Sequence, residues 1–87
     1  MQTKIRRSSI SIMANIAEGF GRHGLKDAKQ FYIIARGSVA ETQSHLYVFK
    51  DAKFISEVEF NETYEQSVTV NKLLNGLISN IIKLMNT

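Results

Sequence analysis

Three glycines in the first third of the chain have the spacing of a cofactor site. Gly19, Gly21 and Gly24 form G-x-G-x-x-G within the segment AEGFGRHG, and a carboxylate, Glu41, follows further on. This is the fingerprint of a dinucleotide-binding turn, in which the backbone and the N-terminus of a helix bind pyrophosphate. The fingerprint functions only when a parallel strand precedes the glycines. Here the preceding apolar segment has helical periodicity, so we predict a chain reversal and no cofactor.

The reversal predicts a role for each residue of the glycine segment. Gly19 or Gly21 is expected to adopt the left-handed conformation that ends a helix. Arg22 and His23 then lie at the negative end of that helix, and Gly24 allows the chain to turn.

Other patterns that could support catalysis or metal binding are incomplete. His23 and His45 are the only histidines, and the chain has no Cys. Glu41 and His45 are four residues apart, whereas a carboxylate metal site in a bundle needs Glu-x-x-His on two helices. No Ser–His–acid arrangement follows from the spacing of the N-terminal hydroxyls, Ser8, Ser9 and Ser11. We therefore predict no catalytic residue, no cofactor and no metal, with the acids in surface ion pairs on helices.

The elements that carry these residues are predicted to be three antiparallel helices, near residues 3–20, 25–53 and 57–85, in one domain over residues 1–87. The fold class is all-α, an up-and-down helical bundle without a sheet. The first helix has an apolar stripe of Ile5, Ile12, Met13, Ile16 and Phe20, with Ser9 filling its gap, and a polar stripe of Arg7, Ser11, Asn15, Glu18 and Arg22. The second has an apolar face of Phe31, Ala35, Val39, Leu46 and Phe49, widened by Tyr32, Ile33, Ile34, Tyr47 and Val48. Gly37 and Ser38, in its middle, predict close approach of another helix.

The third helix has a start signal and too many apolar residues for one small core. Ser56 and Glu59 predict a capping box, with Ile55 available for a hydrophobic staple. One heptad row is Phe60, Ser67, Leu74 and Ile81, and a second is Val70, Leu77 and Leu84. Leu73, Ile78, Ile82 and Met85 lie beside these rows. We expect another subunit to cover the surplus, which makes the protein a homo-oligomer.

The charge is modest but uneven. The net charge is +3, and residues 1–36 carry seven cations against two acids, whereas residues 51–65 are acidic. This polarity predicts an anionic partner for the first half or self-association of basic on acidic surface. For any single charge, a solvated helix face is the better explanation. No segment approaches the ~20 apolar residues of a membrane span, and the N-terminus is a poor secretory signal. We expect a cytoplasmic protein without membrane contact.

The most specific signal is the pair of segments IRRSSISIMANIAEGFGR and FYIIARGSVAETQSHL. They resemble the four-helix-bundle family encoded in intervening sequences of bacterial 23S ribosomal RNA genes, marked by IRRxxxSIxxNIAEGxGR and AxGSxxE. The resemblance implies an up-and-down bundle that assembles as a ring-like homopentamer. It also implies a relative, the accessory variability determinant of diversity-generating retroelements, a basic pentamer that binds nucleic acid and a reverse transcriptase. Most members of the family have no established activity.

The chain departs from the family pattern at its start. In the family a long helix precedes the IRR motif, and here Met1 stands where that helix should already have ended. Either the start of translation has been set too late, or the chain is a fragment, or this member has three helices. A missing helix would leave an apolar groove on the other three.

The motif residues are predicted to lock the first two helices together. If the first two helices run antiparallel and the chain turns near His23, Arg6 and Arg7 lie at the same level as Glu41. An Arg–carboxylate bond there would fix the register of the two helices. By the same antiparallel geometry Glu18 lies level with Lys29, and Asn15 lies near Tyr32. The structural set is Arg6, Arg7, Asn15, Glu18, Gly19, Gly21, Gly37, Ser38 and Glu41. The alternative is contact with nucleic-acid phosphate by Lys4, Arg6, Arg7, Arg22, Lys26 and Lys29. Two functions follow: an RNA- or DNA-binding accessory protein, or a purely protein-binding oligomeric scaffold.

Overall fold

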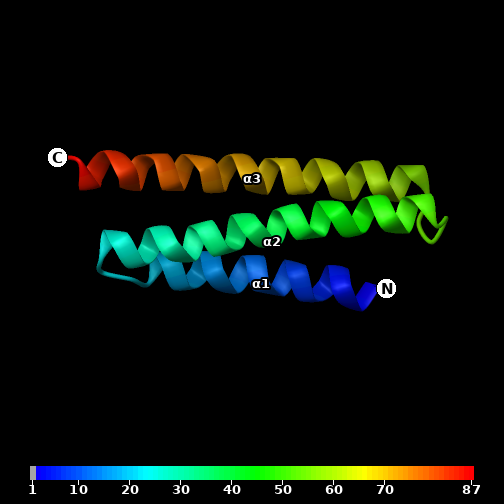
Figure 1. Cartoon of the computed structure of the whole chain (residues 1–87), viewed down its shortest axis with the longest axis horizontal. Helices are drawn as coiled ribbons and strands as arrows, with labels where there is room; N and C mark the ends of the chain where they lie inside the picture. Colours follow the sequence, from blue (N-terminus) through cyan, green and yellow to red (C-terminus); the bar gives the residue numbers. More distant parts are fainter. Residues whose placement is uncertain (1) are drawn as a thin grey trace.

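Three antiparallel helices make up the fold (Figure 1). The structure is a computed structural model that describes residues 2–87, with side chains from residue 6 onward. The helices are α1, Gln2–Phe20, α2, Leu25–Asp51, and α3, Glu57–Met85. No strand occurs between residues 2 and 87. The predicted all-α class and the three predicted helices are confirmed, with ends that differ by at most two residues.

The helices form an open layer, not a closed bundle. α1 and α3 each pack against α2, which lies between them, and within the described chain they do not contact each other. The molecule is accordingly long and thin, with extents of 49 × 19 × 14 Å. Within residues 2–87 no helix is both long and apolar enough to cross a bilayer. The fourth helix implied by the family resemblance stays a prediction.

The core lies where the predicted apolar face of α2 meets the first predicted heptad row of α3. Val39, Leu46 and Leu74 are almost completely buried, and burial of each such side chain contributes about 1.5–3 kcal/mol. The first predicted row of α3 is buried along its whole length, at Phe60, Ser67, Leu74 and Ile81. The second row is half-buried at Val70 and Leu77 and exposed at Leu84.

The apolar stripe of α1 is only partly covered. Ile12 is buried and Ile16 is half-buried, whereas Met13 and Phe20 are 68% and 66% exposed. The gap in the stripe is filled by Ser8, which is buried, and the prediction of Ser9 is wrong, since Ser9 is exposed. The side chain of Ile5 lies outside the described residues. α1 has one neighbour, α2, and a single neighbour covers only one side of a helix.

The turn between α1 and α2 uses no left-handed glycine. No described glycine has a positive φ, so the prediction of a left-handed Gly19 or Gly21 is wrong. Gly19 belongs to α1. The N–H of Gly21 donates to the carbonyl oxygens of Ala17 and Glu18, both at 3.1 Å. These bonds satisfy the last carbonyls of α1 in a right-handed conformation, so a left-handed cap is not needed.

The connection from α2 to α3 follows its sequence signals closely. Lys53 follows α2 with a φ of 62°, in the left-handed region. Ser56 Oγ then accepts a bond of 3.0 Å from the backbone N–H of Glu59, and the Ser56 N–H donates one of 3.0 Å to Glu59 Oε1. The predicted capping box is confirmed. The hydrogen bond from the Ser56 backbone, and then that with its side chain, lower the pKa of Glu59.

Candidate functional site

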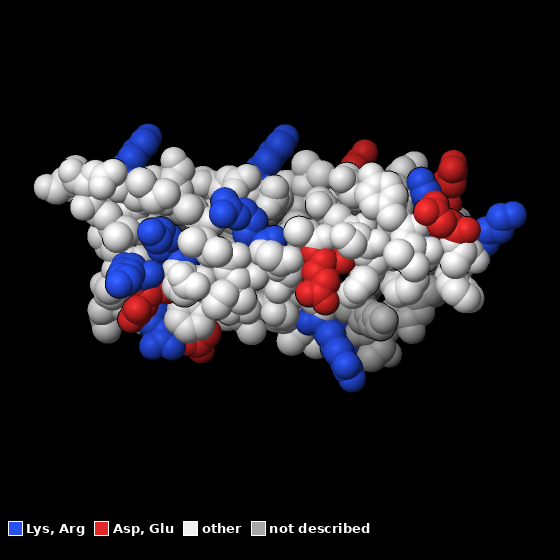
Figure 2. Space-filling view, in the orientation of Figure 1, with Lys and Arg blue, Asp and Glu red and all other residues white. Residues whose placement is uncertain are grey.

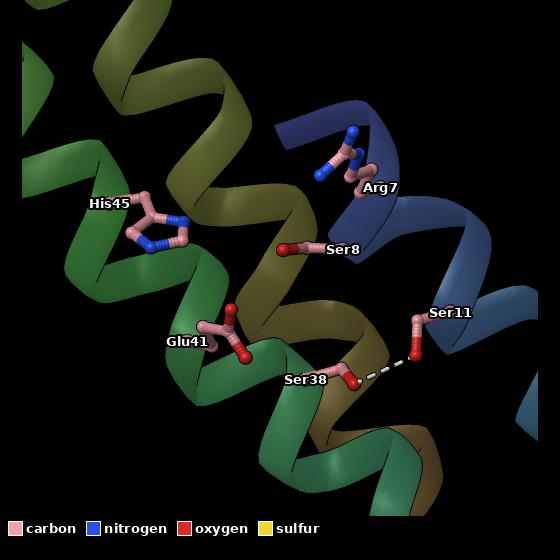
Figure 3. Close-up of a pocket in the computed structure, with 6 residues that line it drawn as sticks. All are labelled: Arg7, Ser8, Ser11, Ser38, Glu41 and His45. Carbon is pink, nitrogen blue, oxygen red and sulfur yellow. Dashed lines mark hydrogen bonds between the residues drawn. The ribbon is translucent and has the colours of Figure 1, made fainter. Parts of the chain in front are cut away.

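A polar pocket between α1 and α2 contains the residues of the family-like motif that meet across the hairpin (Figure 3). Its volume is about 400 Å³. Arg7, Ser8 and Ser11 of α1 and Ser38, Glu41 and His45 of α2 line it. Helical spacing brings these side chains together, because residues three or four apart share one face of a helix.

Hydroxyl groups, not charged groups, join the two helices in this pocket. The hydroxyls of Ser11 and Ser38 share a hydrogen bond of 3.1 Å, drawn as a dashed line in Figure 3. Asn15 Nδ2 donates to the Ser11 carbonyl at 2.8 Å and to its hydroxyl at 3.3 Å. The motif therefore fixes the hairpin through short polar side chains, and Asn15 supports Ser11 from within α1.

The predicted bond from Arg6 or Arg7 to Glu41 is not formed. The level positions of the two helices place Arg7 and Glu41 correctly on one pocket, but Arg6, Arg7 and Glu41 are all exposed and make no ion pair with one another. Among the described residues, one ion pair forms, between Arg22 and Glu18 at 3.0 Å. An exposed ion pair gains little in water and requires two long side chains to be ordered. In this pocket the two helices are joined instead by the hydrogen bond between the Ser11 and Ser38 hydroxyls.

Two glycines of the motif have roles that differ from the predicted ones. Gly19 is buried, and a Cβ atom there would lie within 3 Å of the Tyr32 ring. Tyr32 is 3% exposed, and its burial raises the pKa of its hydroxyl. Gly37 is exposed, and a Cβ there would meet no atom within 4 Å. The prediction that another helix approaches closely at Gly37 is therefore wrong for the described chain. The close approach occurs at Gly19, where Tyr32 of α2 packs.

His45 and Ser8 are pocket residues that the sequence analysis did not assign to a site. Their spacing was the available signal, since Ser8 precedes Ser11 by three residues and His45 follows Glu41 by four. The Nδ1 atom of His45 is buried without a hydrogen-bond partner among the described residues, and its ring packs against Phe49. In the described chain no hydrogen bond joins Ser8, His45 and Glu41.

The pocket contains one guanidinium, from Arg7, three serine hydroxyls and the imidazole of His45. Because the carboxylate of Glu41 also lines the pocket, it would repel a ligand that carries only negative charge. These groups therefore suit hydrogen bonding to a ligand with both positive and negative charge. Between residues 2 and 87, no three of the His, Asp and Glu side chains are grouped so that they could hold a metal ion.

The cations predicted to contact nucleic acid fall into two separate groups. Arg6 and Arg7 lie near the start of α1, and Arg22, Lys26 and Lys29 lie at the turn and the start of α2. Arg7 lies thirteen residues before the end of α1 at Phe20, which is about 20 Å at 1.5 Å per residue, and Arg22 follows in the turn. The guanidinium of Arg22 also stacks on Phe31, 4.8 Å from the ring centroid. The side chain of Lys4 lies outside the described residues. The contact role of this set stays a prediction.

Comparisons with known proteins agree on one family. The family model described as 23S rRNA-intervening sequence protein matches residues 1–76. A crystal structure from Bacteroides thetaiotaomicron is similar, with a TM-score of 0.83 and 29% identity over 87% of this chain and 70% of that chain. That protein is described as one of unknown function from the S23 ribosomal protein family. Comparison with curated proteins gives no match.

Proposed function

This chain belongs to the 23S rRNA-intervening sequence protein family, and from that premise we propose that it is a non-enzymatic, oligomeric nucleic-acid accessory protein. It binds RNA or DNA through the phosphates without reading the bases. The observation that supports this proposal is that few cations of the described chain are paired with a carboxylate. In the described chain a single ion pair, Arg22 with Glu18, neutralises an arginine, and both side chains are about half exposed. Most of the other cations with described side chains are exposed and make no ion pair with a described carboxylate, whereas Lys29 and Lys50 are half-buried. Exposed cations without a carboxylate partner suit a polyanion.

The test of nucleic-acid binding is a salt series. Fluorescence anisotropy with labelled RNA and DNA should show binding at low salt that falls steeply as salt rises, because each phosphate contact releases counterions. Tight binding that salt does not weaken would contradict the mechanism. No binding at low salt would remove the proposal.

The proposed assembly rests on an apolar groove between α1 and α3. Because both helices pack only on α2, the groove between them stays open. Its residues come from all three helices and are Ser9, Ile12, Met13, Val39, Thr42, Thr63, Gln66, Ser67 and Val70. Leu73, beside Val70 on α3, is 53% exposed, and Met13 on α1 is 68% exposed. Exposed apolar side chains gathered at a groove suit an interaction site. The proposed cover is a further copy of the chain, in the pentamer that the family resemblance implies.

Assembly can be tested apart from nucleic acid. Light scattering at micromolar concentration should give several times 9.9 kDa. Met13→Glu with Leu73→Glu should lower that mass, because a carboxylate in a buried apolar contact is costly. Val48→Glu is the matched control, since Val48 is 61% exposed and lies nine residues from Val39, on the opposite face of α2. A monomeric parent protein would refute the assembly.

The second candidate function is an oligomeric scaffold with no nucleic-acid role. The same open groove favours it, since apolar assembly needs no polyanion. Oligomers that bind neither RNA nor DNA at low salt would establish this alternative.

A further inference from the structure

One surface of the molecule carries cations and no Asp or Glu side chain. Residues 28–40 of α2, and residues 66–87, which form most of α3 and its end, contain no Asp or Glu. Their cations are Lys29, Arg36, Lys72 and Lys83. We call these two segments the acid-free surface. By contrast, residues 41–65 carry six acids against two lysines.

The two segments lie side by side in the structure. Arg36 Nη1 donates to Asn75 Oδ1 at 3.1 Å, and Gln43 Nε2 donates to the hydroxyl of Ser67 at 3.0 Å. In an antiparallel pair these bonds place residues whose numbers sum to about 111 at one level. Lys29 of α2 therefore lies level with the last helical turn of α3, which contains Lys83.

The cations of the acid-free surface are open to solvent. Arg36, Lys72 and Lys83 are exposed, and Lys29 is half-buried. None of the four makes an ion pair with a described carboxylate. Figure 2 shows blue side chains along the outer edge of α3 and over the left and central part of the rod, with red side chains chiefly at the lower left, below the centre and at the right end.

We propose that the acid-free surface is where the phosphate backbone of nucleic acid binds. The proposal rests on the proposed function and adds the surface to it. Lys29 and Arg36 are about 10 Å apart along α2, and Lys72 and Lys83 about 16 Å along α3. A duplex presents one phosphate per ~3.4 Å of axis on each strand, so the surface spans about five phosphate steps.

Neighbouring groups favour the same ligand. Asn75 and Ser79 share the face of α3 that carries Lys72 and Lys83, at spacings of three, four and four residues. Amide and hydroxyl donors of this kind bind phosphate oxygens without reading bases. Val70 lines the apolar groove, whereas none of the four cations of the acid-free surface does, so assembly through the groove leaves these cations exposed.

The experiment compares the acid-free surface with a control that loses the same charge. The test variant is Lys29→Gln, Arg36→Gln, Lys72→Gln and Lys83→Gln, and its two-charge form is Lys72→Gln with Lys83→Gln. The control that matches the two-charge form is Lys50→Gln with Lys53→Gln, two cations outside the acid-free surface and outside the contact set predicted from the sequence. Binding to a short RNA duplex and to a DNA duplex of the same length is measured by anisotropy across a salt series, with circular dichroism and light scattering for fold and mass.

The test variant should lose affinity at low salt by an order of magnitude or more, and its salt slope on DNA should fall by up to about 3.6. The control should stay within about threefold of the parent chain. Replacing Lys29, Lys72 and Lys83 by Arg should keep binding, which shows that charge and not fold is tested.

Three results would overturn the proposal. If only the control loses affinity, or the control and the two-charge form lose it equally, the phosphates bind elsewhere while the proposed function survives. If the test variant binds normally but changes mass, the surface is a contact between copies. If the parent chain binds neither duplex at low salt, the proposed function fails together with the surface.

Discussion

Replacing Gly19 by Ala tests whether close packing explains the glycine in the motif. A Cβ atom at Gly19 would lie 2.8 Å from Tyr32 Cζ and 2.9 Å from Cδ1, closer than real side chains approach. The ring is 3% exposed and packs edge-on against Phe20, with centroids 5.9 Å apart, so it cannot move aside freely. Overpacking of this kind costs about 1–3 kcal/mol, whereas Ala in place of a helical Gly gains only about 0.5–1 kcal/mol. Packing should therefore win, and Gly19→Ala should destabilise the protein.

Gly37→Ala provides the matched control. Gly37 is also helical, but a Cβ there meets no atom within 4 Å, so only the propensity gain of about 0.5–1 kcal/mol remains. The two variants should differ by about 1–3 kcal/mol, or about 4–8 °C in Tm for each kcal/mol. Thermal and urea unfolding at one protein concentration measure the difference, because assembly makes Tm depend on concentration.

The interpretation fails if Gly19→Ala melts at or above Gly37→Ala. A double-mutant cycle locates the cause. In a Tyr32→Leu background the ring is gone, so Gly19→Ala should lose most of its penalty. A penalty that persists without the ring would assign the effect to the backbone of α1.

Three further predictions concern polar groups. Ser38→Ala should destabilise the protein by about 0.5–1.5 kcal/mol, because it removes the hydrogen bond between the Ser38 and Ser11 hydroxyls. The double variant with Ser11→Ala should lose less stability than the sum of the two single variants, because both hydroxyls take part in the same bond. Additive losses in chemical unfolding would contradict this. Glu41→Gln should change stability by no more than about 0.5 kcal/mol, since Glu41 makes no ion pair in the described chain; a loss of about 3–5 kcal/mol would indicate a buried pair. Ser56→Ala should cost about 1 kcal/mol as the loss of a helix cap. The pKa of Glu59 is lowered in the folded state from its usual 4.5, so its stabilisation is present above that pH and is lost as pH falls through the folded pKa. Melting curves between neutral pH and roughly pH 3 should show this acid-dependent loss in the parent chain and a smaller loss in Ser56→Ala.

The helices and their buried faces could be predicted because they depend on local interactions. The heptad row Phe60, Ser67, Leu74 and Ile81 is buried as its spacing predicts. The capping box of Ser56 and Glu59 joins residues three apart, so no tertiary contact is needed to form it. The all-α fold could be predicted from the same periodicity. The family could be predicted because each of its two motif segments is contiguous in the sequence.

The polar contacts across the hairpin could be predicted only in part. Antiparallel pairing about the turn brought Arg7 and Glu41 to one pocket, since level positions follow from helix length alone. It could not choose between a long ion pair and the Ser11–Ser38 bond. That choice depends on the distance between the helix axes and on the rotation of each helix about its axis, and short hydroxyls can bond only where the backbones come close.

The sequence by itself determined which residues form helices, which face of each is apolar, and how α3 begins, because these features repeat or close within a few residues. Only the tertiary structure decided that α1 and α3 flank α2 without meeting, that the ring of Tyr32 occupies the place of a side chain at Gly19, and that Arg36 and Asn75 join two segments without Asp or Glu side chains. Each of these depends on how side chains distant in the sequence share space. A helical period fixes the direction of a side chain, but not which neighbour lies in that direction.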